Sequence, residues 1–151
     1  MKKPPKLRQL YRNYQQLTEQ MVAVKNRQWA SENETNKAYL AHLEDAKEFL
    51  IKQLNKELAR APIYDAFLKK IKGIGPALAA GLISEIADIS RFENVSSLYA
   101  YFGVHVQEGA CVHRKKGEPA NWNQTGRSLI CELIPSQFLR HATPVYFGIY
   151  E

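Results

Sequence analysis

The chain has 151 residues, of which 45% are hydrophobic and 11% aromatic, and it carries 21 lysines and arginines against 15 acidic residues. This composition excludes a disordered chain, and the length allows one ordinary domain or a small domain with an extended helical element. The net charge of +6 and the pI near 9.3 favour a polyanionic partner without identifying one.

No segment has the features of a secretory signal or of a membrane span. The longest apolar run, Ala77–Ile83, is interrupted by Gly81 and is much shorter than the roughly 20 residues that cross a bilayer. The two cysteines, Cys111 and Cys131, give no disulfide framework. We therefore expect a cytoplasmic protein in a reducing compartment, with no membrane partner.

The first part of the chain, residues 1–60, has the periodicity of two helices. Its apolar residues recur at alternating spacings of three and four, the pattern of a coiled-coil seam. The first stripe contains Leu7, Leu10, Tyr14, Leu17, Met21 and Val24, and the second contains Tyr39, Leu43, Ala46, Leu50, Leu54 and Leu58. The first helix starts near Pro4 and Pro5, and a polar segment, Ser31–Asn36, separates the two. Each narrow stripe is buried either in an antiparallel hairpin or against a second chain, and both alternatives stay open.

Ala61 and Pro62 break the second helix, because proline lacks an amide donor and its ring clashes with the preceding turn. We place a domain boundary there and expect residues 61–151 to form a compact second domain. This domain is predicted to be densely helical as far as residue 102. After a break at Phe92–Val95, a short helix over Val95–Phe102 is predicted to pack Leu98, Tyr99 and Phe102.

The segment from Gly103 to Asn123 is rich in glycine and carries the basic run 113–116. Such a composition predicts a loop with at most a short strand pair. A final helix is expected around Gln124–Leu139, interrupted or begun by Pro135, before an aromatic tail with Tyr146, Phe147 and Tyr150. The fold class is therefore mainly α, with a helical hairpin followed by a helix-hairpin-helix domain that bears a basic loop.

The strongest functional signal lies within Phe67–Ile83. Gly73 and Gly75 bracket one apolar residue, and Pro76 suits the first turn of a following helix. This spacing resembles the helix-hairpin-helix motif, in which a small residue such as Ala79 lets the two helices pack closely. Without a Cβ, the glycine amides and the helix N-terminus approach a phosphate closely. Binding of this kind is sequence-tolerant and weakens with salt.

We expect two groups of residues to contact nucleic acid. The hairpin group consists of Lys69, Lys70, Lys72, Gly73, Ile74, Gly75 and Ala77, and the loop group consists of Arg114, Lys115, Lys116, Trp122 and Arg127. The loop group suits a segment that follows a backbone and stacks on an exposed base. Two alternatives stay open: a purely structural turn at the glycines, and a solvated loop with Trp122 buried beneath it. A nucleotide-binding P-loop is excluded, because no Gly-Lys-Ser or Gly-Lys-Thr follows Gly75.

Three segments carry a family resemblance: Ile71–Pro76, Glu85–Phe92 and Leu98–Val104. In this order and at similar spacing they resemble the C-terminal domain of transposases of the insertion sequence 110, 116 and 902 family. The resemblance covers about residues 63–140, and the preceding helix pair resembles the coiled-coil region of the family. It implies DNA as a partner, structured guide RNA as a further partner, and a role in transposition.

The resemblance also bears on catalysis. Family members carry an N-terminal nuclease-like domain with metal-binding carboxylates, and their C-terminal domain supplies the serine of a Ser-Gly pair that attacks DNA. The chain begins at the coiled coil, so we expect it to lack that domain and to need magnesium only beside one. No serine lies in Glu108–Cys111, where the pair should fall. Counting from Gly103 without gaps brings Cys111 closest, which makes it the catalytic candidate. The alternative, a small, partly buried cysteine with a structural role, is favoured.

Other function classes have weaker support. A metal site would draw on His105, Cys111, His113 and Cys131, whose spacings do not match paired zinc ligands, so we expect no metal or other cofactor. A hydrolase would draw on Glu85 and Asp88, which we expect on a solvated helix surface. We therefore predict a DNA-binding protein that is not catalytic alone. The alternatives are a transposase or recombinase subunit that acts with a separate metal-binding domain, and a helical homo-oligomer.

Overall fold

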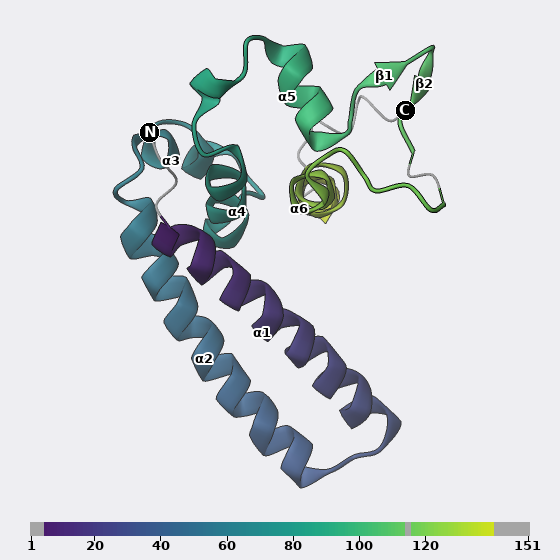
Figure 1. Cartoon of the computed structure of the whole chain (residues 1–151). Coiled ribbons are helices and arrows are strands. Elements are labelled where there is room, and N and C mark those ends of the chain that lie inside the picture. The colour runs from purple at the N-terminus through teal and green to yellow at the C-terminus, as the bar shows by residue number, and fades with distance from the viewer. Residues whose placement is uncertain (1–4, 114–115, 141–151) are drawn as a thin grey trace.

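The computed structural model describes residues 5–113 and 116–140, and in it the chain is mainly helical, as predicted. Two long antiparallel helices, α1 (Pro5–Ala30) and α2 (Glu34–Leu58), form a hairpin, and the shorter elements gather at its open end (Figure 1). The predicted aromatic tail lies outside the described residues.

The hairpin buries its predicted seam within one chain. Towards the tip, Met21, Val24 and Leu43 are at most 6% exposed, and Leu17 and Leu40 pack against them. The turn is shorter than the polar segment suggests, because α2 already begins at Glu34. Asn33 caps it, and its side chain accepts a hydrogen bond from the amide of Thr35 at 2.8 Å. Two stripe positions, Tyr39 and Ala46, remain exposed.

Beyond the hairpin the chain is divided into short elements. They are α3 (Pro62–Ala66), the 3-10 helix η1 (Leu68–Lys70), α4 (Pro76–Ile86), the 3-10 helix η2 (Ile89–Arg91), α5 (Val95–Phe102), β1 (Val106–Gln107), β2 (Ala110–Cys111), α6 (Gln124–Ser128), the π-helix η3 (Leu129–Leu133) and α7 (Ile134–Arg140). The predicted break is present, since Ala61 is the N-cap of α3 and Pro62 follows it. The predicted strand pair is also present, as β1 and β2.

Helix α5 has the predicted bounds for local reasons. At its start the Asn94 side chain accepts a hydrogen bond from the Ser97 amide at 2.9 Å, as part of a capping box. At its end Gly103 adopts the left-handed conformation with φ 67°. One packing prediction for this helix is wrong, because the Tyr99 side chain is 51% exposed. The core-facing stripe of α5 contains Leu98 and Phe102 but not Tyr99.

The final helix continues through Pro135. Its middle section is π-helical, and the amide of Ile134 bonds to the carbonyl oxygen of Leu129, five residues earlier. A widened turn of this kind accommodates a proline that has no amide to donate.

The main core joins the two sides of the break at Pro62. It contains Leu7 and Tyr11 from α1, Leu54 and Leu58 from α2, and Tyr64, Leu68, Ala79, Ala80 and Leu129 from the later elements. At Gly81 an added Cβ would lie 2.7 Å from the Tyr11 ring and 3.0 Å from Leu129. Position 81 therefore requires glycine, because α1 and η3 pack closely against α4 there. The hairpin and the later elements share one core.

Candidate nucleic-acid interface

The turn between η1 and α4 contains the two glycines of the hairpin signal. Gly73 has φ 100°, a conformation that side-chain-bearing residues rarely adopt. Gly75 is the N-cap of α4, with φ −79° and ψ 175°, and no side chain caps the helix. The first intrahelical bond runs from the Ala79 amide to the Gly75 carbonyl at 3.0 Å. The amides of Ala77 and Leu78 are therefore left without a partner inside the helix, and they carry the positive end of its dipole.

An open groove of about 920 Å³ lies in front of this turn. Gly73, Gly75 and the first turn of α4 form one wall of the groove, and α1 and the last helical segment form others. The lining includes the amides and hydroxyls of Gln15, Thr18, Asn26, Ser128 and Gln137. Glu19, Lys47 and apolar side chains such as Val22 and Ile51 also line it, so the uncapped end of α4 opens onto a groove of mixed character.

The three predicted lysines beside the turn are exposed but differ in their partners. The ammonium of Lys69 lies 3.2 Å from the Asp65 carboxylate, one helical turn away. Within the described part of the chain, Lys70 and Lys72 form no ion pair. Lys70 and Lys72 therefore have the free positive charge that a phosphate contact requires.

The basic loop, defined as the segment between Gly103 and Asn123, is a second exposed feature. Its strand pair has the register Val106 to Cys111 and Gln107 to Ala110. All residues from Val106 to Cys111 are exposed, and so is Lys116. Cys111, the catalytic candidate, is a free, exposed cysteine. Arg114 and Lys115 lie outside the described residues.

Trp122 and Arg127 are packed against the start of the loop. The Arg127 guanidinium donates a hydrogen bond to the carbonyl oxygen of Gly103, and its central carbon lies 5.1 Å from the Trp122 ring centroid. A Cβ on Gly103 would lie 2.5 Å from the Trp122 ring. Both side chains therefore have a packing role at the base of the loop, whatever further contacts they make.

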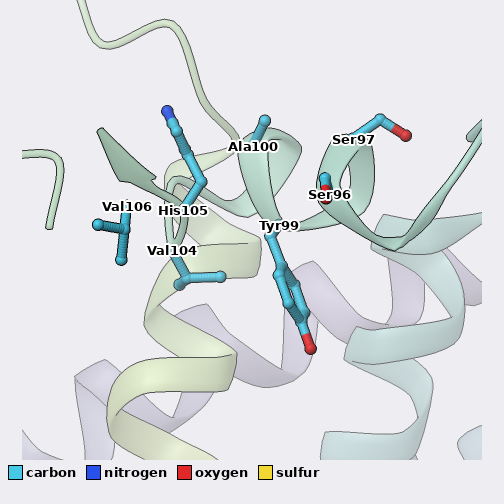
Figure 2. Close-up of a pocket in the computed structure, with 7 residues that line it drawn as sticks. All are labelled: Ser96, Ser97, Tyr99, Ala100, Val104, His105 and Val106. Carbon is cyan, nitrogen blue, oxygen red and sulfur yellow. The ribbon is translucent and has the colours of Figure 1, made fainter. Parts of the chain in front are cut away.

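A smaller cavity of about 620 Å³ lies beside α5 and β1 (Figure 2). Its lining includes the half-exposed Tyr99 ring, two serines and His105. The His105 Nδ1 atom is buried and has no hydrogen-bond partner among the described residues. Tyr99 presents an exposed aromatic surface, whereas Trp122 is partly buried.

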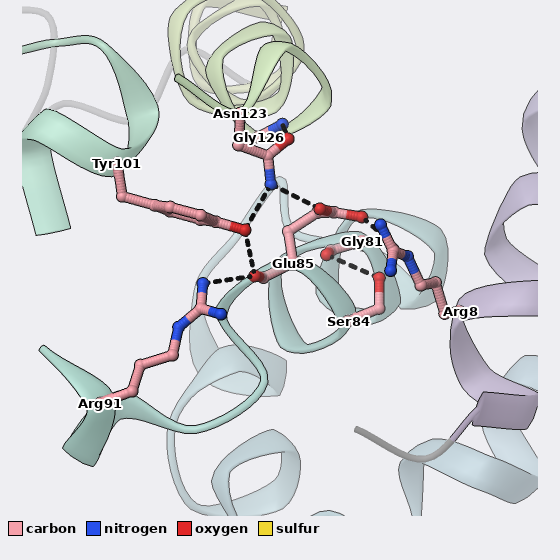
Figure 3. Close-up of polar contacts among 8 residues, drawn as sticks. All are labelled: Arg8, Gly81, Ser84, Glu85, Arg91, Tyr101, Asn123 and Gly126. Atoms are coloured by element: carbon pink, nitrogen blue, oxygen red, sulfur yellow. Dashed lines mark hydrogen bonds and ion pairs between the residues drawn. The ribbon is translucent and has the colours of Figure 1, made fainter. Parts of the chain in front are cut away.

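Sequence reasoning missed a buried carboxylate network centred on Glu85. The prediction that Glu85 and Asp88 share a solvated helix surface is wrong, because the Glu85 residue is 2% exposed and Asp88 lies beyond the end of α4. The carboxylate accepts a hydrogen bond from the Asn123 amide nitrogen at 2.6 Å, and Arg8 Nε lies 3.6 Å from its other oxygen. The network joins α4 to α1 and to the start of α6 (Figure 3).

Tyr101 and Arg91 complete this network. The Tyr101 hydroxyl donates to the Glu85 backbone carbonyl at 3.1 Å and accepts from the Asn123 side-chain amide at 2.7 Å. Arg91 donates to the same carbonyl at 3.4 Å. The sequence did contain one sign of this network: Glu85 is the only charged residue in the otherwise largely apolar α4. A charge in such a helix is buried with it and needs polar partners. The partner 38 residues away has no local signature.

Tyr11 lies next to this network in the core. Burial raises the pKa of Tyr11 to about 12, and the negative charges of Glu85 and Tyr14 contribute to the same direction. Its hydroxyl is buried and has no hydrogen-bond partner in the described structure. The phenol therefore stays neutral at physiological pH and adds no charge to the site.

The described ranges contain neither a metal-binding cluster nor a membrane-spanning helix. In residues 5–113 and 116–140, no three histidine, cysteine, aspartate or glutamate side chains come together in a way that suits a metal ion. No helix in the same ranges has the length and apolar content needed to span a membrane.

Comparison with known proteins places these features in a family. No curated protein and no solved structure matches the chain. The sequence model of the Transposase IS116/IS110/IS902 family, however, matches residues 65–144, more than half of the chain. The matched region contains the turn before α4, the basic loop, and Glu85 with its partners Arg91, Tyr101 and Asn123, whereas the partner Arg8 precedes it. The chain therefore belongs to the IS116/IS110/IS902 family of transposases.

Proposed function

We propose that the chain is a DNA-binding part of a transposase and that it grips phosphate backbone at the turn before α4, as a helix-hairpin-helix does. The observation that carries the proposal is the uncapped N-terminus of α4, preceded by Gly73 and Gly75 and flanked by the exposed Lys70 and Lys72. Free amides at a helix N-terminus bind anions, and neighbouring lysines add a charge contribution that depends on salt.

Membership of a transposase family supports DNA as the partner of this surface. The groove in front of α4 supports it further, since its neutral amides and hydroxyls suit a sugar-phosphate backbone. The basic loop contributes Lys116 in this proposal, and Trp122 and Arg127 support the base of the loop. Arg114 and Lys115 remain candidates that lie outside the described residues. Structured guide RNA is an alternative partner for the same surface, because phosphate contacts do not distinguish the two.

Binding measured over a salt series tests the proposal. Duplex DNA, single-stranded DNA and a structured RNA are each titrated with the wild type, Lys72→Ala and Lys52→Ala. Lys52 is another exposed lysine, on α2, with 76% of its side chain exposed, and it provides a charge-matched control. We expect Lys72→Ala to weaken binding and to reduce the salt slope by about one, with no such change for Lys52→Ala. Equal effects of the two changes, or binding that ignores salt, would contradict the proposal.

Self-association through the helical hairpin is a second candidate function. Val22 and Trp29 are 53% and 95% exposed and lie seven residues apart on one face of α1. Phe49 on α2 is 60% exposed. Exposed apolar side chains of this size indicate a contact surface. Sedimentation of the wild type and of Trp29→Glu tests this candidate. We expect an oligomer that the substitution dissociates, and a wild type that is monomeric at all concentrations would contradict it.

A further inference from the structure

The two ends of the basic loop are held together at a narrow neck. The backbone amide of Asn123 donates a hydrogen bond to the backbone carbonyl oxygen of Tyr101 at 2.8 Å. The Arg127 guanidinium donates to the backbone carbonyl oxygen of Gly103. Trp122 fills the space beside Gly103, and a Cβ on Gly126 would lie 2.2 Å from the Phe102 ring. The neck is therefore closely packed, while the strand pair beyond it is exposed.

This neck is attached to α4 by the Glu85 network. The Asn123 side chain divides its hydrogen bonds between two tasks. Its oxygen accepts from the Gly126 amide at 3.0 Å, which caps α6, while its nitrogen donates both to the Glu85 carboxylate and to the Tyr101 hydroxyl. Figure 3 shows these groups converging from α4, α5 and the start of α6. Desolvated hydrogen bonds to a carboxylate are stronger and geometrically more restrictive than exposed ones.

The same helix therefore carries the phosphate-binding turn at one end and the anchor of the loop at the other. Gly75 and Glu85 are ten residues apart in α4, which corresponds to about 15 Å along the axis. When two binding elements are held at a fixed separation, binding of the first places the second at a high effective concentration near the ligand. The ligand is then bound more tightly than by two elements that move independently.

We propose that Glu85, Tyr101 and Asn123 are positioning residues for nucleic-acid binding. They hold the neck of the basic loop at a fixed position relative to the turn before α4, so that the exposed Lys116 and the turn contact one nucleic acid. This inference rests on the proposed function. It adds that the neck of the loop and the turn keep a fixed separation, and that buried residues remote from the nucleic acid influence its affinity.

Asn123→Ser is the test variant. Serine keeps the oxygen that caps α6 but removes the amide that bonds Glu85 and Tyr101. The matched control is Asn33→Ser, the same change at the N-cap of α2 at the far end of the hairpin. In a Trp29→Phe background, the fluorescence of Trp122 reports on the neck without any ligand. We expect acrylamide to quench Trp122 more strongly in Asn123→Ser and not in Asn33→Ser. Unchanged quenching in Asn123→Ser would overturn the inference.

Binding to duplex DNA then separates the positioning role from a general loss of stability. In the wild type we expect Lys116→Ala and Lys72→Ala each to weaken binding by about threefold or more at low salt. In the Asn123→Ser background, adding Lys116→Ala should leave the DNA affinity nearly unchanged, whereas adding Lys72→Ala should weaken it as much as in the wild type. If Lys116→Ala costs the same in both backgrounds, the positioning role is wrong and the proposed function stands. If neither lysine matters in the wild type, both are wrong.

Discussion

At the scale of single residues, the two glycines before α4 have different reasons to be glycine. Gly73 needs it for its backbone angle, with φ 100°. Gly75 has an ordinary extended backbone, and nothing lies within 4 Å of an added Cβ. Gly75 therefore does not need to be glycine for its backbone angles. The open space in front of it agrees with the proposed access of a phosphate to the amides of α4.

This difference gives the first prediction. Gly75→Val should leave the melting temperature close to that of the wild type and weaken DNA binding, because a branched side chain covers the first amides of α4. Gly73→Ala should instead lower stability by about 1–2 kcal/mol, because its conformation disfavours a Cβ. Thermal unfolding and DNA titration of both variants check this. Unchanged affinity of a folded Gly75→Val would show that the turn is structural.

The buried carboxylate of Glu57 gives a pH prediction. A hydrogen bond from Lys6 at 2.9 Å and the Arg60 guanidinium at 3.0 Å hold the pKa of Glu57 below its usual value of 4.5. Because the pKa of Glu57 is lower in the folded than in the unfolded state, its ionised form stabilises the fold at a pH above the unfolded-state pKa. The contribution is lost as the pH falls through the folded-state pKa.

Glu57→Gln should therefore lower the melting temperature at pH 7, and the difference from the wild type should shrink as the pH falls below about 4.5. Glu48→Gln is the control, since the Glu48 side chain is 76% exposed and pairs with Lys52 at 4.0 Å; an exposed pair contributes little. Melting curves between neutral and acidic pH measure both. A difference that grows towards acid pH would contradict the assignment.

At the scale of elements, the hairpin depends on its buried seam. Leu17 packs against the cluster of Met21, Val24 and Leu43 towards the tip. Leu17→Asp should lower stability by about 2 kcal/mol, because it places a charge against apolar side chains. Gln16→Asp, at an exposed neighbouring position on α1, controls for the added charge. Urea unfolding of the two variants provides the comparison, and equal stabilities would mean that the seam is not packed in solution.

At the scale of the whole molecule, the chain combines a helical hairpin with a compact set of elements that presents the turn and the basic loop. Cys111, the catalytic candidate, is exposed in β2. We predict that the chain by itself binds DNA but neither cuts nor joins it, because the family resemblance assigns the metal-binding carboxylates to another domain.

Labelled DNA with magnesium tests this prediction in the wild type, Cys111→Ser and Cys111→Ala. We expect salt-sensitive binding in all three, without strand breaks or covalent adducts. Cysteine-dependent breaks or adducts in the wild type would make Cys111 a nucleophile and overturn the prediction.

Features that depend on neighbouring residues could be predicted from the sequence. Apolar periodicity predicted the two long helices, Pro62 predicted the break between them, and the flanking Asn94 and Gly103 explain why α5 has its predicted bounds. The three ordered segments identified the transposase family that the family comparison then confirmed. Each of these signals acts over a few residues or within a fixed motif, so it can be read without a fold.

Which side chains are buried, and what they contact, depends on the packing of the folded chain. Glu85 is buried because Asn123, Tyr101 and Arg8 converge on it from three other segments. Trp122 is partly buried against Gly103, which has no Cβ to exclude it, whereas Tyr99 is exposed. Burial depends on elements that are far apart in the sequence and meet only in the folded core, and no local pattern records which of them will meet.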